Sequence, residues 1–202
     1  MRSAMRLALA TVLPGLLVAG CGGGGGDNGG AEPTPTTGSF VGTVAGSDAY
    51  VAIVAGREGH VLAHVTDGAW SVDWVDGFTR GRTASLSNEG GATLDARWSR
   101  RGVTGTFTRP QTPTLTFNAV RVTAPAGLYR AAQDFADGRY VGGWVVLRDK
   151  SMRGTVRRYE IPLTPGEVDA TTFRPGDATF TVPGGVLRPE LVRPTDSLSL
   201  PN

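Results

Sequence analysis

Apolar and polar residues alternate along much of the chain between Ser39 and Thr123. Successive side chains of a β-strand point to opposite faces, so alternation with a period of two is typical of a strand with one buried face. The pattern is clearest in three runs: Trp70, Val72 and Trp74 against Ser71 and Asp73; Ala92, Leu94, Ala96 and Trp98 against Thr93, Asp95 and Arg97; and Val103, Gly105 and Phe107 against Thr104, Thr106 and Thr108. Glycine, aspartate, asparagine or proline bounds each run, and the segment predicts about eight short strands.

Two runs depart from simple alternation. The run from Ala49 to Ala55 is apolar throughout, apart from Tyr50, which predicts a central strand with both faces covered, or with one face against the side chains of a partner strand. In the run from Leu115 to Val122 the apolar phase changes after Phe117. An extra residue near Asn118 or Ala119 would produce that change, so we expect a β-bulge there.

Short connections between the runs require antiparallel neighbours, so consecutive strands should form an up-and-down meander. Closure of the meander into a small barrel would remove exposed strand edges. We therefore expect an all-β fold with a barrel-like meander over residues 39–123. A two-sheet sandwich, which the same alternating strands can build, is the alternative.

The remaining residues, 124–202, have a different pattern. Leu128, Ala131, Ala132 and Phe135 recur with helical spacing, which predicts a short helix within Gly127–Asp137. Strand-like runs resume at 140–148 and 153–159, and frequent prolines thereafter favour loops and edge strands. We expect a loop-rich, Pro-rich β appendage that packs on the meander.

The N-terminal segment has the features of a secretory signal: Arg2 and Arg6, then a broken apolar run from Leu7 to Leu17. That run is shorter than the ~20 residues a spanning helix needs. The residues that follow, Val18-Ala19-Gly20-Cys21, resemble the lipobox of bacterial lipoproteins. The resemblance implies that residues 1–20 are cleaved and that Cys21 receives acyl chains such as palmitate. The alternative is an ordinary secretory signal in which Cys21 is incidental.

The resemblance also bears on location. Gly22 follows Cys21 where the family's inner-membrane sorting signal has Asp, which implies the outer membrane in a cell with two membranes. Residues 21–38 are dominated by glycine, proline and threonine, and so cannot repay the entropy cost of ordering. We expect a disordered tether that joins a cell-envelope lipid anchor to the β-rich body.

The body resembles a group of uncharacterised secreted and lipid-anchored bacterial β-rich proteins. The segments SDAYVAIV at 47–54, GVTGTF at 102–107, AGLYRA at 126–131 and GGWVVLRD at 142–149 carry this resemblance. It implies one coherent module over most of residues 39–158. No activity, cofactor or site is attached to the group, so the resemblance implies no molecular function.

Charge and cysteine content exclude two classes of protein. The net charge of +2 includes Arg2 and Arg6, and their removal leaves 18 basic against 18 acidic residues. A mature chain near neutrality lacks the basic excess of a nucleic-acid binder, so we expect no nucleic-acid partner. The single cysteine allows no internal disulfide, and packing must supply the stability.

The best candidate ligand site is the acidic and aromatic run Asp67, Trp70, Asp73, Trp74, Asp76 and Phe78. Indole faces stack on sugar rings and carboxylates accept hydrogen bonds from sugar hydroxyls, so Trp70, Trp74 and Asp73 are the candidate ligand-binding residues. The favoured interpretation of the tryptophan face is nonetheless core packing. At the open mouth of a barrel, the same residues would form a ligand wall.

Other candidate chemistry is weaker. His60 and His64 share a strand face but lie ~13 Å apart, which is too far for both to bind one metal ion. We therefore expect imidazoles at the rim or in solvent, and no metal or other cofactor.

Asp73 and Asp95 could form a carboxylate pair across a cleft, although a solvated polar face is favoured. Arginine clusters at 97, 100 and 101 and at 153, 157 and 158 could bind phosphate, or simply be solvated.

These patterns favour a membrane-anchored envelope lipoprotein whose β-module binds a small molecule or a protein, or serves as a scaffold, without catalysis. One alternative is a protein-protein interaction or inhibitor module, marked by an exposed apolar patch. The other is a hydrolase of envelope glycans or esters, which requires carboxylates or a histidine gathered in a cleft. The expected membrane partner is the lipid bilayer, through acylated Cys21.

Overall fold

The computed structural model describes residues 37–69, 72–159, 165–168 and 179–201. All of them belong to one compact unit, Ala31–Asn202. Cys21, the expected signal segment, the tether up to residue 36, and Trp70 with Ser71 lie outside the described residues.

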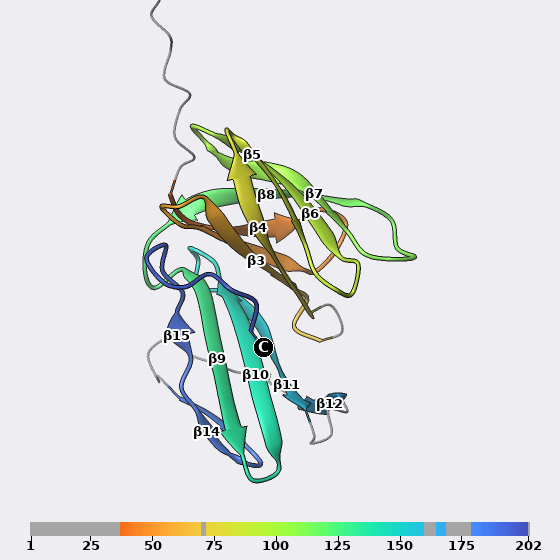
Figure 1. The fold of residues 1–202 in the computed structure, drawn as a ribbon, viewed down its shortest axis with the longest axis vertical. Coiled ribbons are helices and arrows are strands. Elements are labelled where there is room, and N and C mark those ends of the chain that lie inside the picture. The colour runs from red at the N-terminus through yellow and green to blue at the C-terminus, as the bar shows by residue number, and fades with distance from the viewer. Residues whose placement is uncertain (1–36, 70–71, 160–164, 169–178, 202) are drawn as a thin grey trace, which may run out of the picture. The chain divides into compact units, whose positions relative to one another are not determined.

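The first eight strands form a closed antiparallel barrel in which each strand pairs with the next and β8 pairs back with β1. Figure 1 shows these strands in orange to green. They are β1 (Gly38–Val44), β2 (Tyr50–Ala55), β3 (His60–Thr66), β4 (Val72–Arg80), β5 (Thr83–Ser87), β6 (Thr93–Ser99), β7 (Gly102–Thr108) and β8 (Leu115–Val122). The predicted up-and-down meander is confirmed, and it closes as a barrel.

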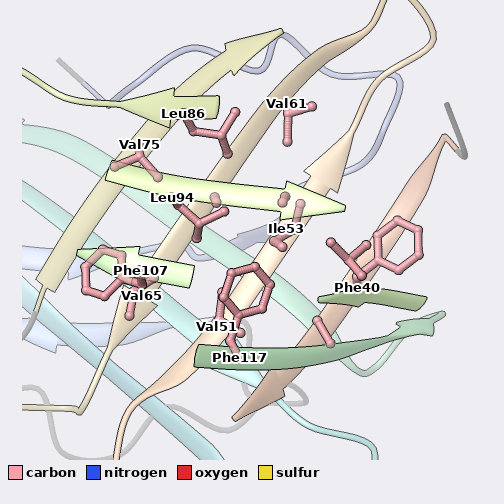
Figure 2. Close-up of a cluster of buried hydrophobic side chains, with 14 of the residues drawn as sticks. Phe40, Val51, Ile53, Val61, Val65, Val75, Leu86, Leu94, Phe107 and Phe117 are labelled. Carbon is pink, nitrogen blue, oxygen red and sulfur yellow. The ribbon is translucent and has the colours of Figure 1, made fainter. Parts of the chain in front are cut away.

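Inward-facing side chains fill the barrel. Every strand contributes apolar residues to one buried cluster, and the larger ones point toward one another in Figure 2. Leu86, Leu94 and Val103 are completely shielded from solvent, and Trp98 is nearly so. The barrel interior is thus a packed core, as expected for a barrel with this number of strands.

A second sheet covers part of the outer barrel wall. It has the order β12-β11-β10-β9-β15 and comprises β9 (Gly127–Phe135), β10 (Gly138–Val146), β11 (Met152–Tyr159), β12 (Pro165–Val168) and β15 (Glu190–Leu191). Its Leu128 and Val145 pack against Ala52, Val54 and Leu62 on the outside of β2 and β3. The apolar run in β2 is therefore covered on both faces, which is one of the two arrangements expected for it.

The predicted β-bulge in β8 is absent. The registers of β8 with β1 and with β7 run without interruption through Asn118 and Ala119. Phe117 and Ala119 face the barrel core, whereas Val120 and Val122 belong to the cluster under the second sheet. The change of apolar phase reflects two covered faces of a regular strand, so the bulge prediction is wrong.

The predicted helix within Gly127–Asp137 is also wrong, because these residues form β9 and the beginning of the β9–β10 turn. Leu128 faces the barrel, while Tyr129, Ala131 and Phe135 face the opposite side of the sheet. That opposite side packs against the hairpin of β13 (Phe180–Val182) and β14 (Gly185–Leu187). Apolar residues on two buried faces of a strand happened to match helical spacing, and pairing with β10 determined the structure.

Tight contact between strands predicts a specific sensitivity at Gly105. A Cβ atom at this position would lie 1.8 Å from the backbone oxygen of Asp95. Since backbone cannot yield without disturbing the β6–β7 ladder, Gly105→Ala should lower the free energy of unfolding by roughly 3 kcal/mol or more, measured by urea denaturation. Gly90→Ala is the control, because its nearest neighbour is the Asn88 side chain at 3.3 Å. Equal stability of the two variants would contradict the tight packing of this ladder.

Candidate functional site

The barrel end opposite Gly38 holds a concave pocket, called here the mouth pocket. It lies among the β1–β2, β3–β4 and β7–β8 connections and has a volume of about 380 Å³. Its apolar floor is continuous with the barrel core, and charged side chains surround it. The floor contains Val44, Ala49, Val65, Phe107 and Leu115, and the rim includes Asp48, Asp67, Arg109 and Arg153. Arg153 comes from β11, so both the barrel and the second sheet build the pocket.

Asp73 lies beneath this rim and is buried. It pairs with Val65 across β3–β4, on the inward-facing side of the wall, and its Oδ2 lies 3.0 Å from Nε of Arg109. Burial raises the pKa of Asp73, while Arg109, Arg157 and a hydrogen bond from Asn88 oppose that rise. The sequence pattern predicted Asp73 on the solvent face. The structure instead turns it inward, where the β7–β8 connection supplies a cationic partner.

Trp74 and His64 occupy the other side of the same wall. Their rings stack with centroids 4.1 Å apart, and His64 is completely buried under the second sheet. Its Nδ1 lies 3.1 Å from the carbonyl oxygen of Asp73. A Cβ atom on Gly143 of β10 would come within 2.4 Å of Trp74 and 2.7 Å of His64, so only glycine lets this stack dock against the sheet.

The predicted ligand wall is therefore divided. Asp73 faces the barrel interior and Trp74 faces the second sheet, since neighbouring strand residues point to opposite sides. Trp70 lies outside the described residues. Trp74 is core-like, as the favoured interpretation held, but it packs between the barrel and the sheet and not inside the barrel.

The two histidines have different surroundings. His60 lies at the rim of the wall as predicted, with Nε2 3.1 Å from Oδ2 of Asp76. His64 was expected at the rim or in solvent and is buried instead. Burial lowers the pKa of His64 from its usual 6.5 to about 4, and the positive charge of Arg157 adds to this effect, whereas hydrogen bonds with the backbone of Asp73 and Gly143 oppose it. The ring is therefore neutral at physiological pH.

The remaining candidate residues are not gathered into one site. Asp95 is exposed on the outer face of β6, so the barrel wall separates it from inward-facing Asp73. The arginine cluster on β11 is also divided. Arg153 lines the mouth pocket, and Arg158 lies 3.6 Å from Asp137.

Two residues of this region, Arg109 and Gly143, were not predicted from the sequence. Arg109 is a single arginine in a turn, and nothing in its local pattern indicates that it reaches Asp73. The repeated glycine in GGWVV was a visible signal of a close contact, but the sequence alone does not say with which residue.

Within the described ranges, no group of three or more His, Cys, Asp or Glu side chains is placed to hold a metal ion. The described part of the chain also contains no helix with the length and apolarity needed to cross a bilayer.

Comparison of the chain with protein-family models, with curated proteins and with solved structures finds no match.

The buried His64 predicts a pH-dependent stability. As the pH falls from 6.5 toward 4, His64 becomes protonated in the unfolded chain but stays neutral in the folded protein. The free energy of unfolding should therefore decrease by up to about 3 kcal/mol over this range. Urea denaturation of the wild type and of His64→Gln at a series of pH values measures this loss. The difference between the two profiles isolates His64, because Asp73 contributes to both.

His60→Gln is the matched control, because it removes the rim imidazole and leaves His64 in place. Between pH 6.5 and 4, the stability profile of His64→Gln should be flatter than those of the wild type and of His60→Gln, because both of these keep the fully buried imidazole of His64. Parallel profiles for wild type and His64→Gln would show that His64 is not buried in neutral form.

Proposed function

We propose that this chain is a lipid-anchored protein of the bacterial envelope whose barrel binds a small molecule at the mouth pocket. The observation that carries the proposal is the pocket itself, in which an apolar floor meets a few convergent charged groups. Its volume of about 380 Å³ lies within the range of small-molecule sites. A ligand with an apolar body and a polar end matches this lining.

The charged groups of the mouth support selective binding. Arg109 is held by buried Asp73 at 3.0 Å. Arg153 lies over the ring of Tyr50, 5.1 Å from its centroid. Side chains fixed in this way lose little freedom when a ligand binds, which favours affinity.

The geometry of the barrel is compatible with an anchor at Cys21. The described chain enters the barrel at Thr37 and Gly38, whereas the mouth pocket lies at the opposite barrel end. A tether that joins at Gly38 therefore leaves the pocket unobstructed by its point of attachment. The resemblance of Val18-Ala19-Gly20-Cys21 to a lipobox supports acylation, and Gly22 favours the outer membrane of a cell that has two membranes.

Anchoring is tested by expression of the full chain with its own leader, beside a Cys21→Ala variant. The wild type should gain the mass of its acyl chains, lose residues 1–20 and enter the detergent phase, because lipid attachment depends on the thiol of Cys21. The variant should gain no lipid mass and remain in the aqueous phase. Identical masses and partitioning for the two proteins would contradict the anchor without bearing on the pocket.

Ligand binding at the mouth is tested with the apolar fluorophore N-phenylnaphthylamine as probe. The wild type should enhance its fluorescence saturably, and Leu115→Gln should weaken binding roughly tenfold, because it removes apolar surface from the pocket floor. Leu147→Gln is the matched control, since Leu147 is also a partly buried leucine but packs under the second sheet. Absence of saturable binding, or equal effects of both variants, would overturn the proposed site.

A further inference from the structure

A shallow groove runs over the outer face of β4, β5, β6 and β7, away from the mouth pocket. Its volume is about 790 Å³, and none of its lining residues belongs to the mouth pocket. The second sheet packs on other parts of the wall, chiefly the outer faces of β2 and β3. This groove, called here the outer groove, is thus a separate feature of the barrel.

Phe78 is the most exposed large hydrophobic side chain among the described residues, with 64% of its surface accessible. One face of its ring stacks on His60, with centroids 4.8 Å apart and planes 16° from parallel. His60 is in turn held by Asp76, whose Oδ2 lies 3.1 Å from Nε2. Phe78 lines the outer groove and His60 does not. The ring is therefore supported from one side and presents apolar surface to the groove.

The β4–β5 ladder lacks two pairs at this position. The β4–β5 register pairs Asp76 with Ser87 and Thr79 with Ala84, but skips Gly77 and Phe78 between them. A Cβ atom at Gly77 would lie 2.8 Å from the carbonyl oxygen of Ser85, so β4 approaches β5 closely there. Because the register is the same on both sides of this gap, no extra residue is inserted, and the alternation of faces leaves Phe78 on the outer face with Asp76.

The rest of the groove is polar and balanced in charge. The outward-facing rows of β5, β6 and β7 supply hydroxyl groups from Ser85, Thr104 and Thr106. Two carboxylates and two guanidinium groups also line it: Asp76, Asp95, Arg80 and Arg97. Such a lining offers donors and acceptors in similar measure and carries no excess of either sign.

We propose that the outer groove binds a neutral glycan chain, with Phe78 as the platform on which one sugar ring stacks. Sugar rings have apolar C–H faces that pack on aromatic rings, and hydroxyl groups that pair with carboxylates, guanidinium groups and side-chain hydroxyls. An anionic polymer would meet Asp76 and Asp95, and a large apolar partner would leave the polar lining unpaired. The matched charges therefore favour a neutral, hydroxyl-rich ligand.

The test is calorimetric titration of the full-length protein with cellohexaose and with fully N-acetylated chitohexaose, two neutral glycans, and with hexagalacturonate as an anionic glycan. At least one neutral glycan should bind more tightly than hexagalacturonate. Phe78→Ala should weaken that binding at least tenfold, as expected for loss of a central aromatic contact. Phe78→Tyr should retain it, because the ring face is preserved.

Val186→Ala is the matched control, because Val186 is the other exposed large hydrophobic residue of the described chain, at 42%, and lies outside the groove. It should leave glycan affinity unchanged. Both exposed side chains can be truncated without loss of core packing, and urea denaturation verifies that each variant folds. Failure of both neutral glycans to bind, tighter binding of the anionic glycan, or equal affinity of Phe78→Ala and wild type would overturn the proposal. None of these outcomes concerns the mouth pocket or the lipid anchor.

Discussion

The packing of β9 and β10 against the outside of β2 and β3 determines how the rest of the structure is arranged. Ala52, Val54 and Leu62 are completely buried on the outer wall, although a small barrel alone would expose them. Removal of this apolar surface from water stabilises the folded state by roughly 25 cal/mol per Å². The barrel therefore requires the second sheet as a cover, and the sheet requires the barrel.

That contact makes one side of the barrel different from the other. On the covered side, the His64–Trp74 stack is sealed against Gly143, and β11 brings Arg153 to the edge of the mouth pocket. On the uncovered side, the outer faces of β5, β6 and β7 carry serine, threonine, Asp95 and Arg97 toward solvent. Two surfaces of different chemistry thus result from one asymmetric contact.

The sequence predicted the barrel well because alternation and short turns are local properties of the chain. It failed where residues distant in sequence decide the environment. Asp73 faces inward, where Arg109 of the β7–β8 connection pairs with it. His64 is buried because β10 packs over it at Gly143. Leu128, Ala131 and Phe135 indicated a helix because a strand with two covered faces can carry apolar residues at helical spacing.

The sequence predicted which residue types could contact a ligand, but not how the fold would group them into sites. The aromatic and acidic residues between positions 67 and 78 were recognised as candidates for ligand contact, yet the fold distributes them over three environments. Asp67 lines the mouth pocket, Trp74 packs under the second sheet, and Phe78 lines the outer groove. Alternation predicted which residues share a face of a strand. The packing of the second sheet and the positions of the turns determine what each face contacts.

We propose above all that the barrel mouth is a ligand site built jointly by barrel and sheet. A two-dimensional NMR titration with N-phenylnaphthylamine tests this most directly. Amide shifts should change at Val65, Leu115 and Arg109 on the barrel and at Arg153 on the sheet, while those of Ser85 and Asp95 should stay unchanged. Shift changes spread over the surface, or confined to the outer groove, would contradict this proposal.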